Sequence, residues 1–126
     1  MQECNLCPAG WQVPTDEDWG ILKTYLGGEV AAGKMKEAGS THWRGENVGA
    51  TNESGWSGFP DGNRSGSNGV YSTSLYNGYW WSTTEHSNTT DALAHFLTTV
   101  SGTITGPMLN RSKTSGLSVR CLRHNN

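Results

Sequence analysis

The sequence has few charged residues and lacks any long apolar run. Charged residues make up 16% of the 126 residues and hydrophobic residues 33%, against roughly 25% and 45% in average soluble domains. No apolar segment approaches the roughly 18 residues that a membrane-spanning helix needs. No basic segment followed by an apolar one marks a secretory signal peptide. We therefore expect no membrane insertion by this segment and no signal sequence within it.

Positive charge is also scarce. Nine Lys and Arg stand against eleven Asp and Glu, which gives a net charge of −2. A protein that binds nucleic acid through its phosphates needs a Lys/Arg cluster, and none is present. Repeats of short period are absent too, which excludes solenoids and propellers. At this length we expect one domain, residues 1–126.

Small polar residues and aromatic residues are abundant instead. Gly, Ser, Thr and Asn together supply 54 of the 126 residues, yet the chain also holds six Trp, four Tyr and two Phe. Disordered chains are poor in aromatic residues. The composition therefore predicts a small, loop-rich domain with an aromatic core.

Three cysteines, Cys4, Cys7 and Cys121, allow three pairings, and their spacing does not choose among them. The C-x-x-C of Cys4 and Cys7 lacks a second pair of zinc ligands. It also lacks the βαβ unit typical of a redox motif. We favour a disulfide between Cys7 and Cys121, which would indicate an oxidising, extracytoplasmic setting and would leave Cys4 free or available to a neighbouring chain.

The first third of the chain predicts a short strand and helices. Residues 11–13 form the strand, and Thr15 caps a helix whose first turn holds three acidic residues. Trp19, Leu22 and Leu26 give that helix one apolar stripe. A weaker helical stretch covers 29–36, and a long loop that folds back on the core covers 39–78.

The last third predicts strands over 79–84, 93–100, 103–105 and 116–123. In the final strand, Leu117, Val119 and Cys121 share one face. The order of elements predicts an α+β domain with helices packed against an antiparallel sheet.

Several motifs resemble one known family. They are C-P-A-G-W-Q-V-P-T over 7–15, T-H-W over 41–43, G-A-T-N-E-S-G over 49–55, G-Y-W-W-S-T-T-E over 78–85 and S-V-R-C over 118–121. In this order they resemble the Fibrobacter succinogenes major paralogous domain family, over nearly the whole chain.

The resemblance implies a C-type lectin-like fold, with one or two helices packed on a small twisted antiparallel sheet beside a long irregular loop region. It implies a secreted or cell-surface bacterial module, often one domain of a larger protein. It also implies that Cys7 and Cys121 tie the terminal strands together. Formylglycine-generating enzymes are more distantly similar, but their reactive cysteine pair is not expected here.

The chain departs from the family pattern over 59–64 and 91–97, and the strand that usually precedes the first cysteine is missing or truncated. A truncated strand can leave a neighbouring edge open. Some proteins varied by diversity-generating retroelements resemble this fold and display changing residues from their C-terminal β region. The divergence over 91–97 fits that idea.

The sequence gives only weak evidence for a catalytic site or for an aromatic ligand-binding site. Ser82, Glu85 and His86 contain the residue types of a hydrolase triad, but neighbouring side chains on a strand face opposite sides. The same alternation separates Trp80 from Trp81, so we expect one in the core and the other half exposed. We expect no enzymatic activity.

No cofactor is certain from the sequence. The oxygen-bearing side chains in and beside the long loop favour a structural calcium ion. Calcium takes six to eight oxygen ligands. Asn47, in the long loop, is an oxygen donor in addition to the expected ligands. The expected ligands are Asn52, Glu53, Asp61, Asn63 and Glu85. Ordinary solvated loop polarity is the alternative.

The C-terminal β region is the best candidate surface. In the strand over 93–100, Phe96 and Val100 look buried, which places His95 and Thr99 outward. The alternative, a second core layer on the His95 face, stays open. The expected ligand-binding residues are His95, Thr99, Ser101, Thr103, Thr105, Met108, Asn110 and Arg111.

These observations predict a non-catalytic extracellular module that binds a protein or glycan at a cell surface. The alternative is a building block of a surface fibre, layer or fimbrial tip that associates with copies of itself. Spare Cys4 and the truncated first strand favour that alternative.

Overall fold

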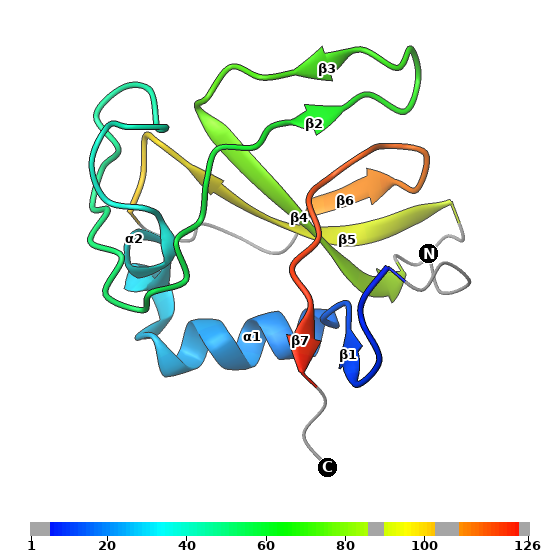
Figure 1. Cartoon of the computed structure of the whole chain (residues 1–126), viewed down its shortest axis with the longest axis horizontal. Helices are drawn as coiled ribbons and strands as arrows, with labels where there is room; N and C mark the ends of the chain where they lie inside the picture. Colours follow the sequence, from blue (N-terminus) through cyan, green and yellow to red (C-terminus); the bar gives the residue numbers. More distant parts are fainter. Residues whose placement is uncertain (1–5, 86–89, 103–108, 124–126) are drawn as a thin grey trace.

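A computed structural model describes residues 6–85, 90–102 and 109–123, and it has the α+β architecture that the sequence predicts. Helices α1 (Asp16–Tyr25) and α2 (Ala31–Met35) are joined by the 3-10 turn η1 (Gly28–Val30). The central sheet contains β4 (Asn77–Glu85), β5 (Asp91–Thr98) and β6 (Leu109–Ser112), in that order and antiparallel. In Figure 1, α1 lies on one side of this sheet and the β2–β3 hairpin on the other.

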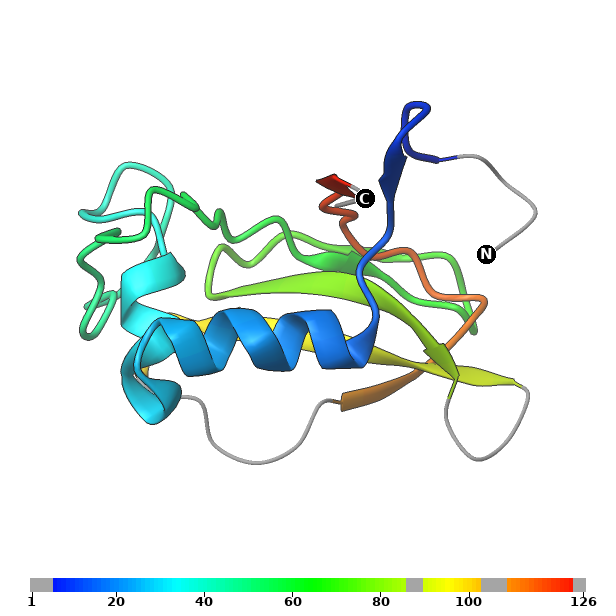
Figure 2. The ribbon, with the colours of Figure 1, turned by 90° about the horizontal axis from the view of Figure 1, so that it is seen from below.

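Two small sheets complete the fold. The hairpin pairs β2 (Asn63–Arg64) with β3 (Tyr71–Ser72), and the two ends of the chain meet where β1 (Trp11–Gln12) pairs with β7 (Leu122–Arg123). Figure 2 shows α1 running along the underside of the central sheet. None of the helices in the described part is long and apolar enough to cross a membrane.

Helix α1 begins where the sequence predicts. Thr15 accepts a hydrogen bond from the backbone N–H of Asp18, and the carboxylate of Asp18 accepts one from the N–H of Thr15. This reciprocal capping box satisfies two amide groups that the first turn leaves unpaired. The helix ends at Tyr25 with Leu26 as its C-cap, and Gly27 follows in the left-handed conformation with φ of 108°, where glycine carries no steric cost.

Trp80 and Trp81 divide the interior into two clusters, because adjacent side chains of β4 face opposite sides of the sheet. Both indoles are buried, so the prediction that one would be half exposed is wrong. The larger cluster joins Trp80 to the helices and the long loop; its buried members are Trp19, Ala32, Met35, Trp43, Trp80 and Leu97. The smaller cluster joins Trp81 to β5 and to the terminal segments; its members and neighbours are Trp81, Ala92, Ala94, Val13, Leu117 and Val119.

The long loop folds back on the core as predicted. Trp43 is buried, and its indole N–H donates to the carbonyl of Gly58 at 2.9 Å. Lys36, directly after α2, is fully buried and donates to the carbonyls of Val48, Thr98 and Ser101 at 2.7, 3.0 and 3.1 Å. One ammonium group therefore holds α2, the loop and the end of β5 together.

The C-terminal segment differs from the single strand expected over 116–123. Gly116 bridges to Arg64 antiparallel, Ser118 bridges to Trp80 parallel, and only Leu122–Arg123 forms a strand with β1. The segment changes partner twice because it crosses three elements in turn. The expected strand over 103–105 lies outside the described residues.

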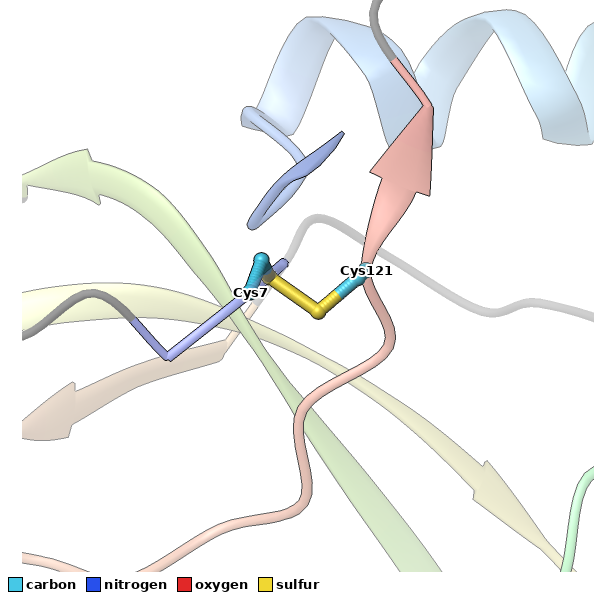
Figure 3. The surroundings of a disulfide bond; sticks show 2 residues. All are labelled: Cys7 and Cys121. Carbon is cyan, nitrogen blue, oxygen red and sulfur yellow. A yellow bond between two sulfur atoms is a disulfide. The ribbon is translucent and has the colours of Figure 1, made fainter. Parts of the chain in front are cut away.

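A disulfide joins the two ends of the chain, as the family resemblance implies. The Cα atoms of Cys7 and Cys121 lie 5.8 Å apart, and the bond spans 114 positions of sequence (Figure 3). It lies beside the β1–β7 pair, so the ends are held by hydrogen bonds and by a covalent bond. Cys4 lies outside the described residues.

Candidate functional site

His95 and Thr99 lie in the interior, so the interpretation that placed them outward is wrong. His95 is 2% exposed and stacks on Trp19, whereas Val100, expected inside, is 74% exposed. The Thr99 hydroxyl donates to the carbonyl of Arg44 at 2.6 Å and accepts from the N–H of Asn47 at 2.9 Å. The physical reason is that helix α1 covers His95 and the long loop covers Thr99, so this face of β5 is the second core layer that the sequence allowed as the alternative.

The other predicted ligand-binding residues do not lie together. The carbonyl of Ser101 accepts from Lys36, and Arg111 lies on β6 with its guanidinium 5.0 Å from the ring of Tyr79. Asn110 also lies on β6, but its side chain is outside the described part. Thr103, Thr105 and Met108 lie outside the described residues. Arg111 also lines a surface cavity.

Two adjoining cavities flank the β2–β3 hairpin, and Asn63 lines both. One, of about 280 Å³, lies between the hairpin and the segment 116–118. The other, of about 390 Å³, lies between the hairpin and the segment 111–115. We call the two cavities together the polar surface; its main side chains are Asp61, Asn63, Arg64, Tyr71, Thr73, Arg111, Ser112, Thr114 and Ser118.

Short backbone approaches fix the walls of the polar surface. A Cβ atom at Gly62 would lie 1.9 Å from the carbonyl oxygen of Ser72, and one at Gly66 would lie 2.2 Å from the hydroxyl of Thr114. Glycine is the residue that permits such contacts. Arg64 and Gly116 exchange two backbone hydrogen bonds of 2.8 and 2.9 Å. The hairpin is therefore held against the C-terminal segment by main-chain contacts.

The polar surface presents one aromatic ring and several hydrogen-bonding groups. Tyr71 is 72% exposed, and the guanidinium carbon of Arg64 lies 6.0 Å from its ring. The carboxylate of Asp61 accepts from the hydroxyl of Ser118 at 3.1 Å. Arg64 forms no ion pair with any described residue, and the Nε of Arg111 is buried without a hydrogen-bond partner there.

Sequence reasoning missed Arg64, Tyr71 and Ser118. The signal that was available is the Ser65–Gly69 stretch, S-G-S-N-G, which is rich in turn residues and lies between Asn63–Arg64 and Tyr71–Ser72. It marks the β2–β3 hairpin within the region 39–78, for which the sequence predicts a loop.

The predicted calcium ligands do not share one environment. Asn52 and Ser57 hydrogen-bond to each other beside α2, whereas Asp61 and Asn63 line the polar surface. Asn47 donates to the carbonyls of Glu37 and Gly39. Glu53 is exposed, and the side chain of Glu85 is outside the described part. Within the described ranges, no three His, Cys, Asp or Glu side chains gather as a metal-binding group. Calcium binding stays a prediction.

The serine of the weak triad is poorly placed for attack on a substrate. Ser82 is fully buried, and its hydroxyl donates to the carbonyl of Leu93 at 2.9 Å. A nucleophile must be within reach of a base and of the substrate. His86 lies outside the described residues.

Comparison with known proteins supports the resemblance found in the sequence. The family model described as the Fibrobacter succinogenes major domain matches residues 1–123. No curated protein and no solved structure matches the chain. The family match covers almost the full length of the chain. The chain therefore belongs to the Fibrobacter succinogenes major domain family.

Proposed function

We propose that the chain is a non-catalytic recognition module that binds a glycan at the polar surface, outside the cell. The observation that carries the proposal is the exposed ring of Tyr71 beside Asp61, Asn63 and Arg64. The apolar face of a sugar ring can pack on a tyrosine ring, because such a ring offers a flat apolar body. Sugar hydroxyls both donate and accept, and the carboxylate, amide and guanidinium groups supply matching partners.

A hydrogen-bond donor without a partner among the described residues also favours the polar surface as the binding site. The buried Nε of Arg111 lacks a partner in the described part of the chain. An unpaired buried donor costs about 1–3 kcal/mol, and a guanidinium that turns toward the cavity would bring this donor to a ligand hydroxyl. The Cys7–Cys121 disulfide supports the extracellular setting. A C-type lectin-like scaffold is part of this proposal, supported by the paired, disulfide-bonded termini and the helix-covered sheet.

A glycan array probed with the purified domain tests the proposal. We expect binding that Tyr71→Ala abolishes and that Asp61→Asn weakens. Tyr25→Ala is the matched control, because Tyr25 is also a highly exposed tyrosine but lies on α1. An array without a bound glycan, or binding that survives Tyr71→Ala, would contradict the proposal.

A second candidate function is self-assembly into a surface structure. The β1–β7 sheet has only two strands in the described part of the chain, and Trp11 and Leu122 on it are exposed. Such an edge can accept a strand from another copy. Analytical ultracentrifugation at high protein concentration, with and without reductant, tests this candidate. A monomer under both conditions would contradict it.

A further inference from the structure

A third cavity, of about 270 Å³, lies between α1 and the C-terminal segment and shares no lining residue with the polar surface. We call it the indole pocket. Its walls are mostly apolar, and Arg120 and Asp18 are its charged lining residues. The apolar walls come from Pro14, Trp19, Leu22, Trp56 and Leu122.

The aromatic wall of the indole pocket is packed from behind. Trp19 and Trp56 meet edge to face with ring centroids 5.7 Å apart. His95 stacks on Trp19 at 4.7 Å, and Trp80 contacts Trp56 edge to face at 4.9 Å. Rings packed in this way have little rotational freedom. The pocket is therefore preformed, which lowers the entropic cost of binding.

Arg120 supplies the positive charge of the indole pocket. Its guanidinium carbon lies 4.5 Å from the ring of Trp56, and the residue is exposed. It forms no ion pair with any described residue. The carboxylate of Asp18 is engaged with the N–H of Thr15 in the capping box. Stacking on Trp56 thus orients a guanidinium whose hydrogen bonds remain available to an anion.

The size of the cavity and its charge together indicate the occupant. Small-molecule sites usually measure about 300–1,000 Å³, so this pocket is smaller than most of them. Protein partners often insert one large aromatic side chain into such a pocket, where it contributes much of the binding energy. We propose that the indole pocket binds an aromatic side chain of a partner polypeptide, next to a carboxylate that pairs with Arg120.

Capped dipeptides test this proposal without knowledge of the natural partner. The probes are acetyl-Asp-Phe-amide, acetyl-Asn-Phe-amide and acetyl-Asp-Ala-amide, titrated against the ¹⁵N-labelled domain. The readout is the indole N–H resonances of the six Trp residues. We expect Trp19 and Trp56 to shift, with a Kd on the order of 1 mM for the Asp-Phe probe.

The control probes and variants distinguish the contribution of the aromatic side chain from that of the carboxylate. Asn-Phe should bind about two- to five-fold more weakly than Asp-Phe, as expected for an exposed ion pair, and Asp-Ala should not bind. Arg120→Gln should remove the difference between Asp-Phe and Asn-Phe. Arg123→Gln, an exposed arginine on β7 that does not line the pocket, should preserve it.

Several outcomes would overturn the proposal. They are the absence of shifts at the solubility limit, shifts that exclude Trp19 and Trp56, and equal affinities of the Asp-Phe and Asn-Phe probes for the unchanged domain. A dimer in ultracentrifugation that the Asp-Phe probe dissociates would show that a second copy occupies the pocket, and would also overturn it. Tyr71→Ala should leave probe binding intact, so this result is distinguishable from failure of the glycan proposal.

Discussion

The imidazole of His95 lies flat against the indole of Trp19, with ring centroids 4.7 Å apart and an angle of 11° between the planes. Its Nε2 is buried and has no hydrogen-bond partner in the described part of the chain. Burial, and to a lesser extent the nearby positive charge of Lys23, together lower the pKa of His95 to about 3. The folded protein therefore holds this histidine neutral.

Acid should destabilise the domain through His95. Below pH 6.5 the histidine of the unfolded chain binds a proton that the folded chain does not bind until about pH 3. The stability that neutral His95 contributes is fully present above the pKa of this histidine in the unfolded chain, and it is lost as pH falls. Linkage gives a loss of about 2 kcal/mol in the free energy of unfolding between pH 7 and pH 5. Urea unfolding at the two pH values measures it.

His95→Gln is the control for this effect, because glutamine does not titrate. The variant should be less stable at pH 7, since it disturbs the stack on Trp19, but its unfolding free energy should change much less between pH 7 and pH 5. An equal loss in both proteins would assign the pH dependence to other groups.

Lys36 should be one of the most sensitive positions for stability. Burial lowers the pKa of Lys36 to about 8, so the group is charged at pH 7, and three carbonyls accept from it. Lys36→Met would leave those acceptors without this donor, and we expect a loss of about 3 kcal/mol. Chemical unfolding at pH 7 measures the change.

Lys34→Met provides the comparison, because Lys34 lies in α2 but is only partly buried. Replacing a lysine whose side chain reaches the surface should change the free energy of unfolding by less than about 0.5 kcal/mol. Similar losses in the two variants would show that the three carbonyl contacts of Lys36 do not carry the effect.

Two helical glycines should respond to alanine in opposite directions. A Cβ atom at Gly33 in α2 would lie 2.2 Å from the carbonyl oxygen of Gly49, whereas one at Gly20 in α1 meets nothing within 4 Å. Gly20→Ala should stabilise the domain by about 0.5–1 kcal/mol. Gly33→Ala should destabilise it by about 2 kcal/mol, because the backbones must separate. Thermal unfolding of both variants measures the signs, and a stabilised Gly33→Ala would contradict this packing.

Removal of the disulfide should destabilise the domain strongly. The bond closes a loop of 114 positions, for which the chain-entropy model gives about 4–5 kcal/mol. Cys7→Ser with Cys121→Ser should therefore unfold at a much lower urea concentration. Cys4→Ser is the control and should keep the bond. Peptide mapping without reductant, if it found Cys4 joined to Cys7, would contradict the pairing.

Local signals in the sequence predicted the N-terminal half of the fold well. Thr15 and the acidic first turn located α1, because helix capping depends on residues close together in the chain. The alternation of Trp80 and Trp81 was also predicted, since it follows from strand geometry. That both indoles would be buried was not, because it depends on what the rest of the chain places on each face of β4.

The error at β5 has a similar cause. Both faces of that strand carry apolar residues, so periodicity alone did not distinguish the Phe96 face from the His95 face. Packing of α1 against β4 and β5 decided it and buried His95 and Leu97. The polar surface and the indole pocket depend on contacts between segments far apart in sequence, such as Asp61 with Ser118 and Trp56 with Arg120. Such pairs leave no local pattern.

The position of the Cys7–Cys121 bond has a mechanical consequence. Tension applied to the chain on the outer sides of the two cysteines would pass from one backbone to the other through the sulfur atoms, whose Cα atoms are 5.8 Å apart. The 113 residues between them would carry none of that load. A pulling force that unravels an unbridged domain would leave residues 7–121 folded and would act on β7 alone among the strands, because β7 lies outside the bridged segment.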